Sequence, residues 1–419
     1  MAYRAKHVRQ RSGIKAVGVV AGLVVGALMA WGLYVARPDT PSAGAAASSQ
    51  PTSTPTVSSV SPTPSIPSPT AVIPFDTSGP PSAELRLKLV KTIDGDISPK
   101  SVAASGTGLV FAQNMMYNDT VTVYDARGRL MHTISDAVRL SRFGFDRYPD
   151  VVRGSPVEAA FSPDGRTVYV SNYSMYGPGF PSPGHDSCSP ADGHDRSFLF
   201  KIDVITARIE DVIQVGSVPK VVATTPDGRY VLDSNWCSYD LSVSSTRTDR
   251  EIERIPIGPY PRGIAIDDAS RYAYVAVMGS TQIAKIDLRT FKVSWITDVG
   301  SGPRALVLSP DGRFLYATLN SSNAVAKIDL RTEEVVGRTT VGSEPRSMTI
   351  APDGLSLYLV NYNSDTAMKI RARDMVLLQT VQTGTDPIGI TYEPMRDQVW
   401  ISNYTGSIMV FDEVRPADA

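Results

Sequence analysis

A repeat of 42 residues runs through most of this chain and constrains its fold more than any other feature. In each regular copy a glycine precedes a proline by a few residues, and the proline starts a short apolar stretch. A polar turn follows, often Pro-Asp-Gly, and then a stretch of aromatic and β-branched residues that usually ends in asparagine. The marker prolines at the 42-residue spacing are Pro219, Pro261, Pro303, Pro345 and Pro387. Two earlier copies start at Pro99 and Pro156, and their spacings of 57 and 63 residues leave room for insertions of 15 and 21 residues.

Each complete copy has the pattern of four short strands. In the copy that starts at Gly258, the expected strands are residues 261–267, 272–277, 282–287 and 292–298. Polar turns separate these stretches, which is typical of the blade of a β-propeller. Seven copies therefore predict an all-β fold, a seven-bladed β-propeller of four-stranded blades that spans residues 83–419.

The two ends of the repeat region predict how the ring closes. The seventh copy stops near Asp412 and lacks an outer strand, whereas residues 85–93, before the first copy, alternate between apolar and polar. Closing a ring of blades removes exposed sheet edges. We therefore expect the N-terminal strand to complete the last blade.

The N-terminal region predicts a membrane anchor. Residues 1–15 hold five basic residues and no acidic one, and residues 16–36 form a charge-free stretch of 21 residues. That length spans a bilayer as a helix, and the basic flank predicts a cytoplasmic tail with the rest of the chain outside. The expected location is the plasma membrane, with a single-pass transmembrane signal-anchor. A cleaved signal peptide is the alternative, although its apolar region is usually about 7–15 residues long.

A linker separates this segment from the repeats. Residues 37–82 contain 11 prolines together with many serine, threonine and alanine residues. Such a composition cannot bury a core and predicts a disordered, extended stalk. The net charge of −1 gives no bulk attraction to nucleic acid, so any binding of a polyanion needs a local basic patch.

The blade motifs resemble a known repeat family. Second-strand sequences such as Tyr169-Val-Ser-Asn172 and Trp400-Ile-Ser-Asn403 end 16 residues after their marker prolines, and several follow Ser-Pro-Asp-Gly-Arg. This pattern closely resembles the YVTN family of β-propeller repeats, which includes YncE-like proteins. The resemblance implies a periplasmic or surface protein with a binding role. Lactonase-type and haem-binding propellers are similar more distantly, and no residue set carries their chemistry over. One departure is Val277, which stands where other copies have asparagine.

Basic residues recur next to the marker prolines. They are Lys100, Lys220, Arg262, Arg304 and Arg346. Repeat geometry places them at the starts of the inner strands, around one mouth of the central channel, where a ring of cations would concentrate an anion. Glu158 stands among them, where other copies have small residues, and would pair with the ring or serve as an acid or base. Alternatively, the basic side chains only pack over neighbouring strands.

Asparagine ends most of the second strands on the same face. The candidates for offering an amide to a ligand are Asn172, Asn235, Asn361 and Asn403, and Asn114 and Asn320 occupy equivalent positions. The alternative role for these side chains is to bond the backbone of the adjacent turn.

Both insertions fall on the face that carries the basic residues. They span about residues 135–154, in the link between the first two blades, and about residues 173–196, in the second blade. Long loops that gather on one face of a rigid scaffold usually serve binding.

The second insertion repeats the tripeptide Gly-His-Asp, at residues 184–186 and 193–195. His185, Asp186, His194 and Asp195 form a candidate site for a divalent metal within residues 184–195, although their spacing matches no standard site. Otherwise no cofactor is expected. Cys188 and Cys237 lie in loops of adjacent blades, and outside the cytoplasm we expect them to form a disulfide.

Together these features predict a membrane-anchored extracytoplasmic binding or scaffold protein. Its ligand would dock on the inserted basic face, and the candidates are a cell-wall polymer, nucleic acid or a protein partner. The alternative is an extracytoplasmic hydrolase or lactonase-like enzyme that uses Glu158 at the same mouth. The sequence contains no nucleophile elbow and no dinucleotide-binding fingerprint, which favours the binding role.

Overall fold

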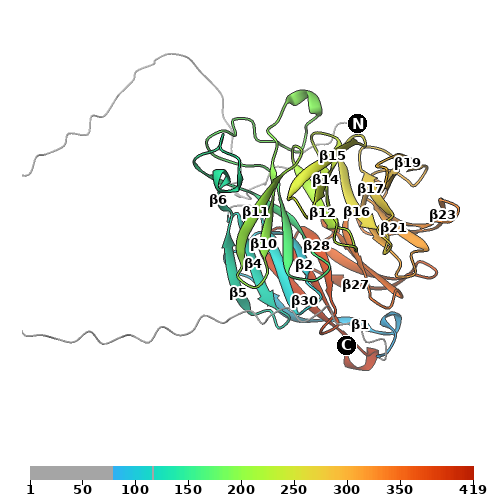
Figure 1. The fold of residues 1–419 in the computed structure, drawn as a ribbon. Helices are drawn as coiled ribbons and strands as arrows, with labels where there is room; N and C mark the ends of the chain where they lie inside the picture. Colours follow the sequence, from blue (N-terminus) through green and yellow to red (C-terminus); the bar gives the residue numbers. More distant parts are fainter. Residues whose placement is uncertain (1–78, 116–117) are drawn as a thin grey trace, which may run out of the picture. The chain divides into compact units, whose positions relative to one another are not determined.

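The computed structural model describes residues 79–115 and 118–419. They form seven four-stranded antiparallel sheets and one small two-stranded sheet (Figure 1). This confirms the predicted all-β seven-bladed propeller of four-stranded blades. Within these residues no helix has the length and apolar character needed to cross a bilayer. The basic tail at 1–15, the predicted span at 16–36 and the linker up to residue 78 lie outside the described residues.

Within each blade, successive strands lie farther from the propeller axis. The first strands are β2 (Pro99–Ala104), β8 (Pro156–Phe161), β12 (Pro219–Thr224), β16 (Pro261–Ile266), β20 (Pro303–Leu308), β24 (Pro345–Ile350) and β28 (Pro387–Glu393). The second strands are β3 (Leu109–Asn114), β9 (Thr167–Asn172), β13 (Tyr230–Asn235), β17 (Tyr272–Val277), β21 (Phe314–Leu319), β25 (Ser356–Asn361) and β29 (Gln398–Asn403). The third strands are β4 (Thr120–Asp125), β10 (Phe198–Asp203), β14 (Asp240–Ser245), β18 (Ile283–Asp287), β22 (Ala324–Asp329), β26 (Thr366–Arg371) and β30 (Ser407–Val414). The outer strands are β5 (Leu130–Ser135), β11 (Arg208–Gln214), β15 (Arg250–Pro256), β19 (Val293–Ile296), β23 (Glu334–Thr340), β27 (Val376–Gln382) and β1 (Arg86–Ile93).

The first strands contact one another in an unbroken circle around the axis. Each touches the first strand of the next blade, and β28 of the seventh blade touches β2 of the first. Space there is tight: a side chain added at Gly263 would place its Cβ 2.4 Å from the carbonyl oxygen of Arg304 in the next blade. The small residues of the inner strands therefore allow the blades to converge, and the apolar core lies farther out, between neighbouring blades.

The N-terminal strand closes the ring as predicted. Strand β1 pairs antiparallel with β30 and completes the last blade (Figure 1). A short 3-10 turn at Ser82–Glu84 precedes it. The Lys369 amine holds this turn by donating hydrogen bonds to the carbonyl oxygens of Ser82, at 2.6 Å, and Leu85, at 3.0 Å. The same amine pairs with the Glu413 carboxylate of β30, and both side chains are buried.

The two insertions pack on each other. The first contains β6 (Ala137–Arg139), a 3-10 turn at Leu140–Phe143 and β7 (Val151–Arg153), and β6 pairs with β7. The second contains a 3-10 turn at Pro190–Asp192. A β-bridge joins Arg153 of the first insertion to Tyr176 of the second, and the Tyr148 ring stacks on Phe180 at 4.5 Å. Two further 3-10 turns lie at Tyr362–Ser364 and Pro416–Asp418.

Candidate functional site: a cationic pocket at the channel mouth

The repeat positions the cations. Because each first strand begins at its marker proline, the following residue is the second of the strand and lies at one end of the central channel. Five of these residues are cationic, as the sequence shows, and four of them are almost fully buried. Their exposed fractions are 6% for Lys100, 4% for Lys220, 5% for Arg262 and 6% for Arg304.

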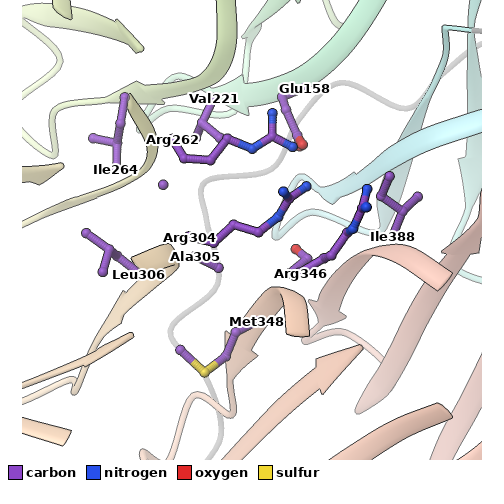
Figure 2. A pocket seen from close by; sticks show the side chains of 12 residues that line it. Glu158, Val221, Arg262, Ile264, Arg304, Ala305, Leu306, Arg346, Met348 and Ile388 are labelled. Atoms are coloured by element: carbon purple, nitrogen blue, oxygen red, sulfur yellow. The ribbon is translucent and has the colours of Figure 1, made fainter. Parts of the chain in front are cut away.

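Three of the arginines line one pocket of about 120 Å³. Arg262, Arg304 and Arg346 come from β16, β20 and β24 of three consecutive blades, and Glu158 reaches the pocket from β8. Figure 2 shows the three guanidinium groups and the Glu158 carboxylate directed toward the same space. Apolar side chains such as Leu306 and Met348 form other parts of the wall. The pocket is smaller than the roughly 300–1,000 Å³ typical of sites for drug-sized ligands, so its size suits a single anionic group.

Aromatic rings and a thioether hold the arginines. The Arg262 guanidinium lies 5.6 Å from the centre of the Trp236 ring, and the Arg346 guanidinium lies 3.5 Å from the centre of the Tyr362 ring. Arg304 Nη1 lies 3.6 Å from the Met278 sulfur. An aromatic face attracts a cation electrostatically, so these contacts fix the guanidinium groups without neutralising them.

Two of the three arginines keep a donor available for a ligand. Arg262 Nη1 and Arg346 Nε are buried and have no hydrogen-bond partner among the described residues. Arg346 also forms an ion pair with Glu344 at 3.0 Å. Burial lowers the pKa of Arg262 from its usual value, because a desolvated guanidinium is less stable in its charged form. A buried donor without a partner is costly, and a bound anion would remove that cost.

The aromatic residues that contact the arginines occupy a recurring position in the repeat, which the sequence analysis above did not identify. The residue directly after the second-strand asparagine is aromatic in four copies: Tyr173, Trp236, Tyr362 and Tyr404. Three of these rings contact a cation of the mouth, since Tyr173 lies against Lys220. The basic residue after the marker proline and the aromatic residue after the asparagine recur at fixed places in the repeat. Together they indicate a set of cations that lie against aromatic rings.

Lys220 is tied to the second insertion. Its amine donates a hydrogen bond to Asp186 at 3.0 Å and lies 4.1 Å from the centre of the Tyr173 ring. Burial lowers the pKa of Lys220 to about 8, although Asp186 opposes that shift. The Lys220 charge in turn lowers the pKa of Asp186. The inserted loop thus supplies its own anion to one side of the mouth.

Lys100 and Glu158 form a looser pair. The Lys100 amine lies 4.0 Å from a Glu158 carboxylate oxygen. Burial, and next the charge of Arg262, hold the pKa of Lys100 well below its ordinary value, while Glu158 raises it. Glu158 is the one acidic side chain in the pocket lining, and the structure places it beside the cations as the sequence indicated.

The asparagine side chains lie outside this pocket. All six are buried, and none lines it. The Asn172 amide donates to the Phe198 carbonyl oxygen at 3.0 Å, and the amides of Asn361 and Asn403 donate to hydroxyl groups at the start of the third strand. Asn235 binds Asp240 and Ser242, both at 2.8 Å. This placement favours a structural role over the ligand-binding role predicted for Asn172, Asn235, Asn361 and Asn403.

The candidate metal residues of the second insertion do not converge. The His185 and His194 rings meet edge to face at 4.8 Å, but Asp186 turns to Lys220 and Asp195 accepts a hydrogen bond from the Ser182 backbone at 2.6 Å. Within the described part of the chain no group of three or more histidine, cysteine or acidic residues is arranged to hold a metal ion.

A disulfide joins the second insertion to the third blade. It links Cys188 and Cys237, whose Cα atoms lie 5.3 Å apart. Next to it, the Trp236 indole nitrogen donates a hydrogen bond to the Asp186 carbonyl oxygen at 2.9 Å. The disulfide and this hydrogen bond hold Asp186 over Lys220.

Comparisons with known proteins agree with the propeller fold and do not assign a function to the pocket. The model of a lactonase family, described as a seven-bladed β-propeller, matches residues 294–375, a stretch that includes Arg304 and Arg346 but not Arg262 or Glu158. No curated protein matches the chain. Among solved structures, hydrazine synthase of Kuenenia stuttgartiensis is similar, with 18% sequence identity and a TM-score of 0.60, over 78% of this chain and 97% of that chain. At this identity the likeness shows a shared fold, so the chemistry of the mouth has to be judged from this chain's own residues.

Proposed function

We propose that this protein is a binding module that captures an anionic group of its ligand at the cationic pocket. The observation that carries the proposal is the convergence of Arg262, Arg304 and Arg346 on one pocket. Two buried donors there, Arg262 Nη1 and Arg346 Nε, have no hydrogen-bond partner among the described residues. Guanidinium forks match the geometry of carboxylate and phosphate oxygens. Partial exclusion of water strengthens such contacts relative to the open surface.

The size of the pocket limits what enters it. A pocket of about 120 Å³ accepts one carboxylate or phosphate group rather than a whole polymer. The rest of the ligand would then lie across the insertions that flank the mouth. A cell-wall polymer fits this description best, since its anionic groups recur along a chain, and nucleic acid or an acidic protein partner are the other candidates.

We also propose that the propeller works outside the cytoplasm, anchored through residues 16–36. The length of that charge-free stretch, its basic flank and the disulfide at Cys188 and Cys237 support this location. Deleting residues 1–36 is expected to move the protein from the membrane fraction to the soluble fraction. Membrane association that persists without residues 1–36 would refute this part of the proposal.

Binding to a panel of anions tests the function. The purified full-length chain would be titrated with acetate, phosphate, single-stranded DNA and a teichoic-type polymer at two salt concentrations. We expect binding that weakens with salt and is lost when Arg262, Arg304 and Arg346 are all changed to alanine. The matched control changes three exposed arginines outside the mouth, Arg127, Arg129 and Arg289, to alanine and should keep the binding. Equal binding by both triple variants would overturn the proposal.

A lactonase-like hydrolase is the second candidate. The match of residues 294–375 to the lactonase family and the position of Glu158 in the pocket favour it. In this case Glu158 would act as a general base toward a water molecule, and the arginines would stabilise the oxyanion that forms at the attacked carbonyl. Incubating the same preparations with simple lactones is expected to show turnover that Glu158→Gln abolishes. Turnover that is absent, or equal in the Glu158→Gln variant, excludes this candidate.

A further inference from the structure

The Lys100 amine is a buried basic group that has no strong partner among the described residues. The side chain of Lys100 is 7% exposed, and its amine lies 4.0 Å from the Glu158 carboxylate, which is too long for a hydrogen bond. Glu158 lines the pocket, so the amine lies 4.0 Å from a carboxylate that borders the ligand space. Lys100 is itself not part of the lining, and a ligand would reach its amine past the Glu158 side chain.

Lys220 provides an internal comparison. Its amine is equally buried, but Asp186 accepts its hydrogen bond at 3.0 Å and the Tyr173 ring lies 4.1 Å away. These contacts stabilise the charged form of Lys220 and occupy the amine. The two lysines are therefore similarly buried, but the amine of Lys100 is more available to react with a ligand than the amine of Lys220.

The charges around Lys100 favour its neutral form. The groups that act on it are Arg262 of β16, Glu158 of β8, Arg304 of β20 and Lys220 of β12, so three cations oppose one carboxylate. Arginine stays protonated in proteins. When buried cations repel one another, the proton therefore leaves from a lysine, and Lys100 lacks the close carboxylate that Lys220 has. An unprotonated amine is a nucleophile.

Building on the anion-binding function proposed above, we propose that Lys100 forms a reversible imine with a 2-oxo acid whose carboxylate is held by the arginines of the pocket. The nitrogen lone pair attacks the carbonyl carbon, and one N–H proton passes to the carbonyl oxygen to give a carbinolamine. The Glu158 carboxylate takes the remaining N–H proton and passes it to the departing hydroxyl group, which leaves as water while the C=N bond forms. The two hydrogens of the amine and the carbonyl oxygen are the atoms of that water, so no oxidant or reductant takes part.

Reductive trapping tests the proposal. The full-length chain would be incubated with pyruvate and sodium borohydride, which delivers hydride to the imine carbon and leaves a stable secondary amine. Mass spectrometry of peptides is expected to place the adduct on Lys100, with adduct formation at least about tenfold higher than on the exposed Lys88. The reason is that only about one in 10³ molecules of an ordinary lysine is neutral at pH 7. The Lys100→Arg variant keeps the charge and should form no adduct at this position. Adduct spread evenly over surface lysines would overturn the proposal.

Two outcomes separate this proposal from the binding function. Lactate carries the same carboxylate but no carbonyl group, so it serves as the binding control. Binding of lactate without a pyruvate adduct overturns the imine and leaves the binding function standing. Binding of neither acid, with no adduct, overturns both.

The pH dependence of trapping separates a direct role from a structural one. The trapping rate should fall as the pH drops through the pKa of Lys100, because protonation removes the lone pair. Glu158→Gln removes a charge that raises this pKa and should move the midpoint to lower pH, whereas Arg262→Gln removes a charge that lowers it and should move the midpoint to higher pH. Shifts in the same direction, or no shift in either variant, would contradict the assignment of Lys100.

Discussion

Replacing Lys369 with methionine is expected to lower the free energy of unfolding by about 3–5 kcal/mol, the usual cost of removing one partner from a buried ion pair. Lys369 and Glu413 are 0% and 1% exposed. The Lys369 amine also binds the carbonyl oxygens of Ser82 and Leu85, so the change removes two of the contacts that fix the turn before β1. Within the described part of the chain, Glu413 would remain buried with the hydroxyl groups of Tyr358 and Tyr392 as its remaining side-chain donors.

Chemical denaturation followed by circular dichroism measures this effect. Arg129→Ala, which breaks an exposed pair with Asp125, is the control and should change little, since surface ion pairs contribute little to stability. The double variant Lys369→Met with Glu413→Leu should recover part of the loss, because it leaves no unpaired buried charge. If the Lys369→Met variant is as stable as the unchanged protein, Lys369 does not stabilise the closed ring.

Changing Arg262 to glutamine should affect binding and stability in opposite directions. Hydrogen bonds to charged groups contribute about 1.5–3 kcal/mol, so we expect the affinity for a small oxyanion to fall by roughly 10- to 100-fold. The free energy of unfolding should stay equal or rise, because the change removes a desolvated charge with an unpartnered Nη1 atom beside other cations. Such a trade between stability and function is typical of binding sites.

Calorimetric titration with phosphate and thermal unfolding without ligand measure the two quantities for the Arg262 variant. Arg250→Gln is the control: this arginine of β15 also lies over an aromatic ring, that of Phe145, but it is outside the pocket lining. It should leave the affinity unchanged. A variant at Arg262 that loses stability and keeps its affinity would show that this arginine serves packing.

The architecture follows from the sequence because propeller blades repeat. The spacing of the marker prolines predicts the blades, and the unpaired alternation of residues 85–93 predicts the closing strand. The gathering of the cations next to the prolines is also predictable, because each of them is the second residue of an innermost strand and lies at the same end of the channel. Local pattern and global fold agree at these positions.

The contacts between different repeats are not predictable in this way. The carboxylate of Asp186 reaches Lys220 across 34 residues of sequence, from a loop whose conformation no periodic pattern encodes. The packing of Tyr148 on Phe180 likewise depends on two irregular insertions that meet in space. The sequence leaves open whether the asparagines serve a ligand or the local structure. Their burial and the hydrogen bonds of Asn172, Asn361 and Asn403 to the start of the third strand favour a structural role.

A crystal structure of the protein with selenate tests the central claim most directly, because selenium can be located by its anomalous scattering. The account predicts one strong anomalous peak within hydrogen-bond distance of the guanidinium groups of Arg262 and Arg346, in the pocket that Glu158 lines. It also predicts that the peak disappears in the Arg262→Gln variant. Selenate bound elsewhere on the propeller, with this pocket empty, would contradict the assignment of the channel mouth as the binding site.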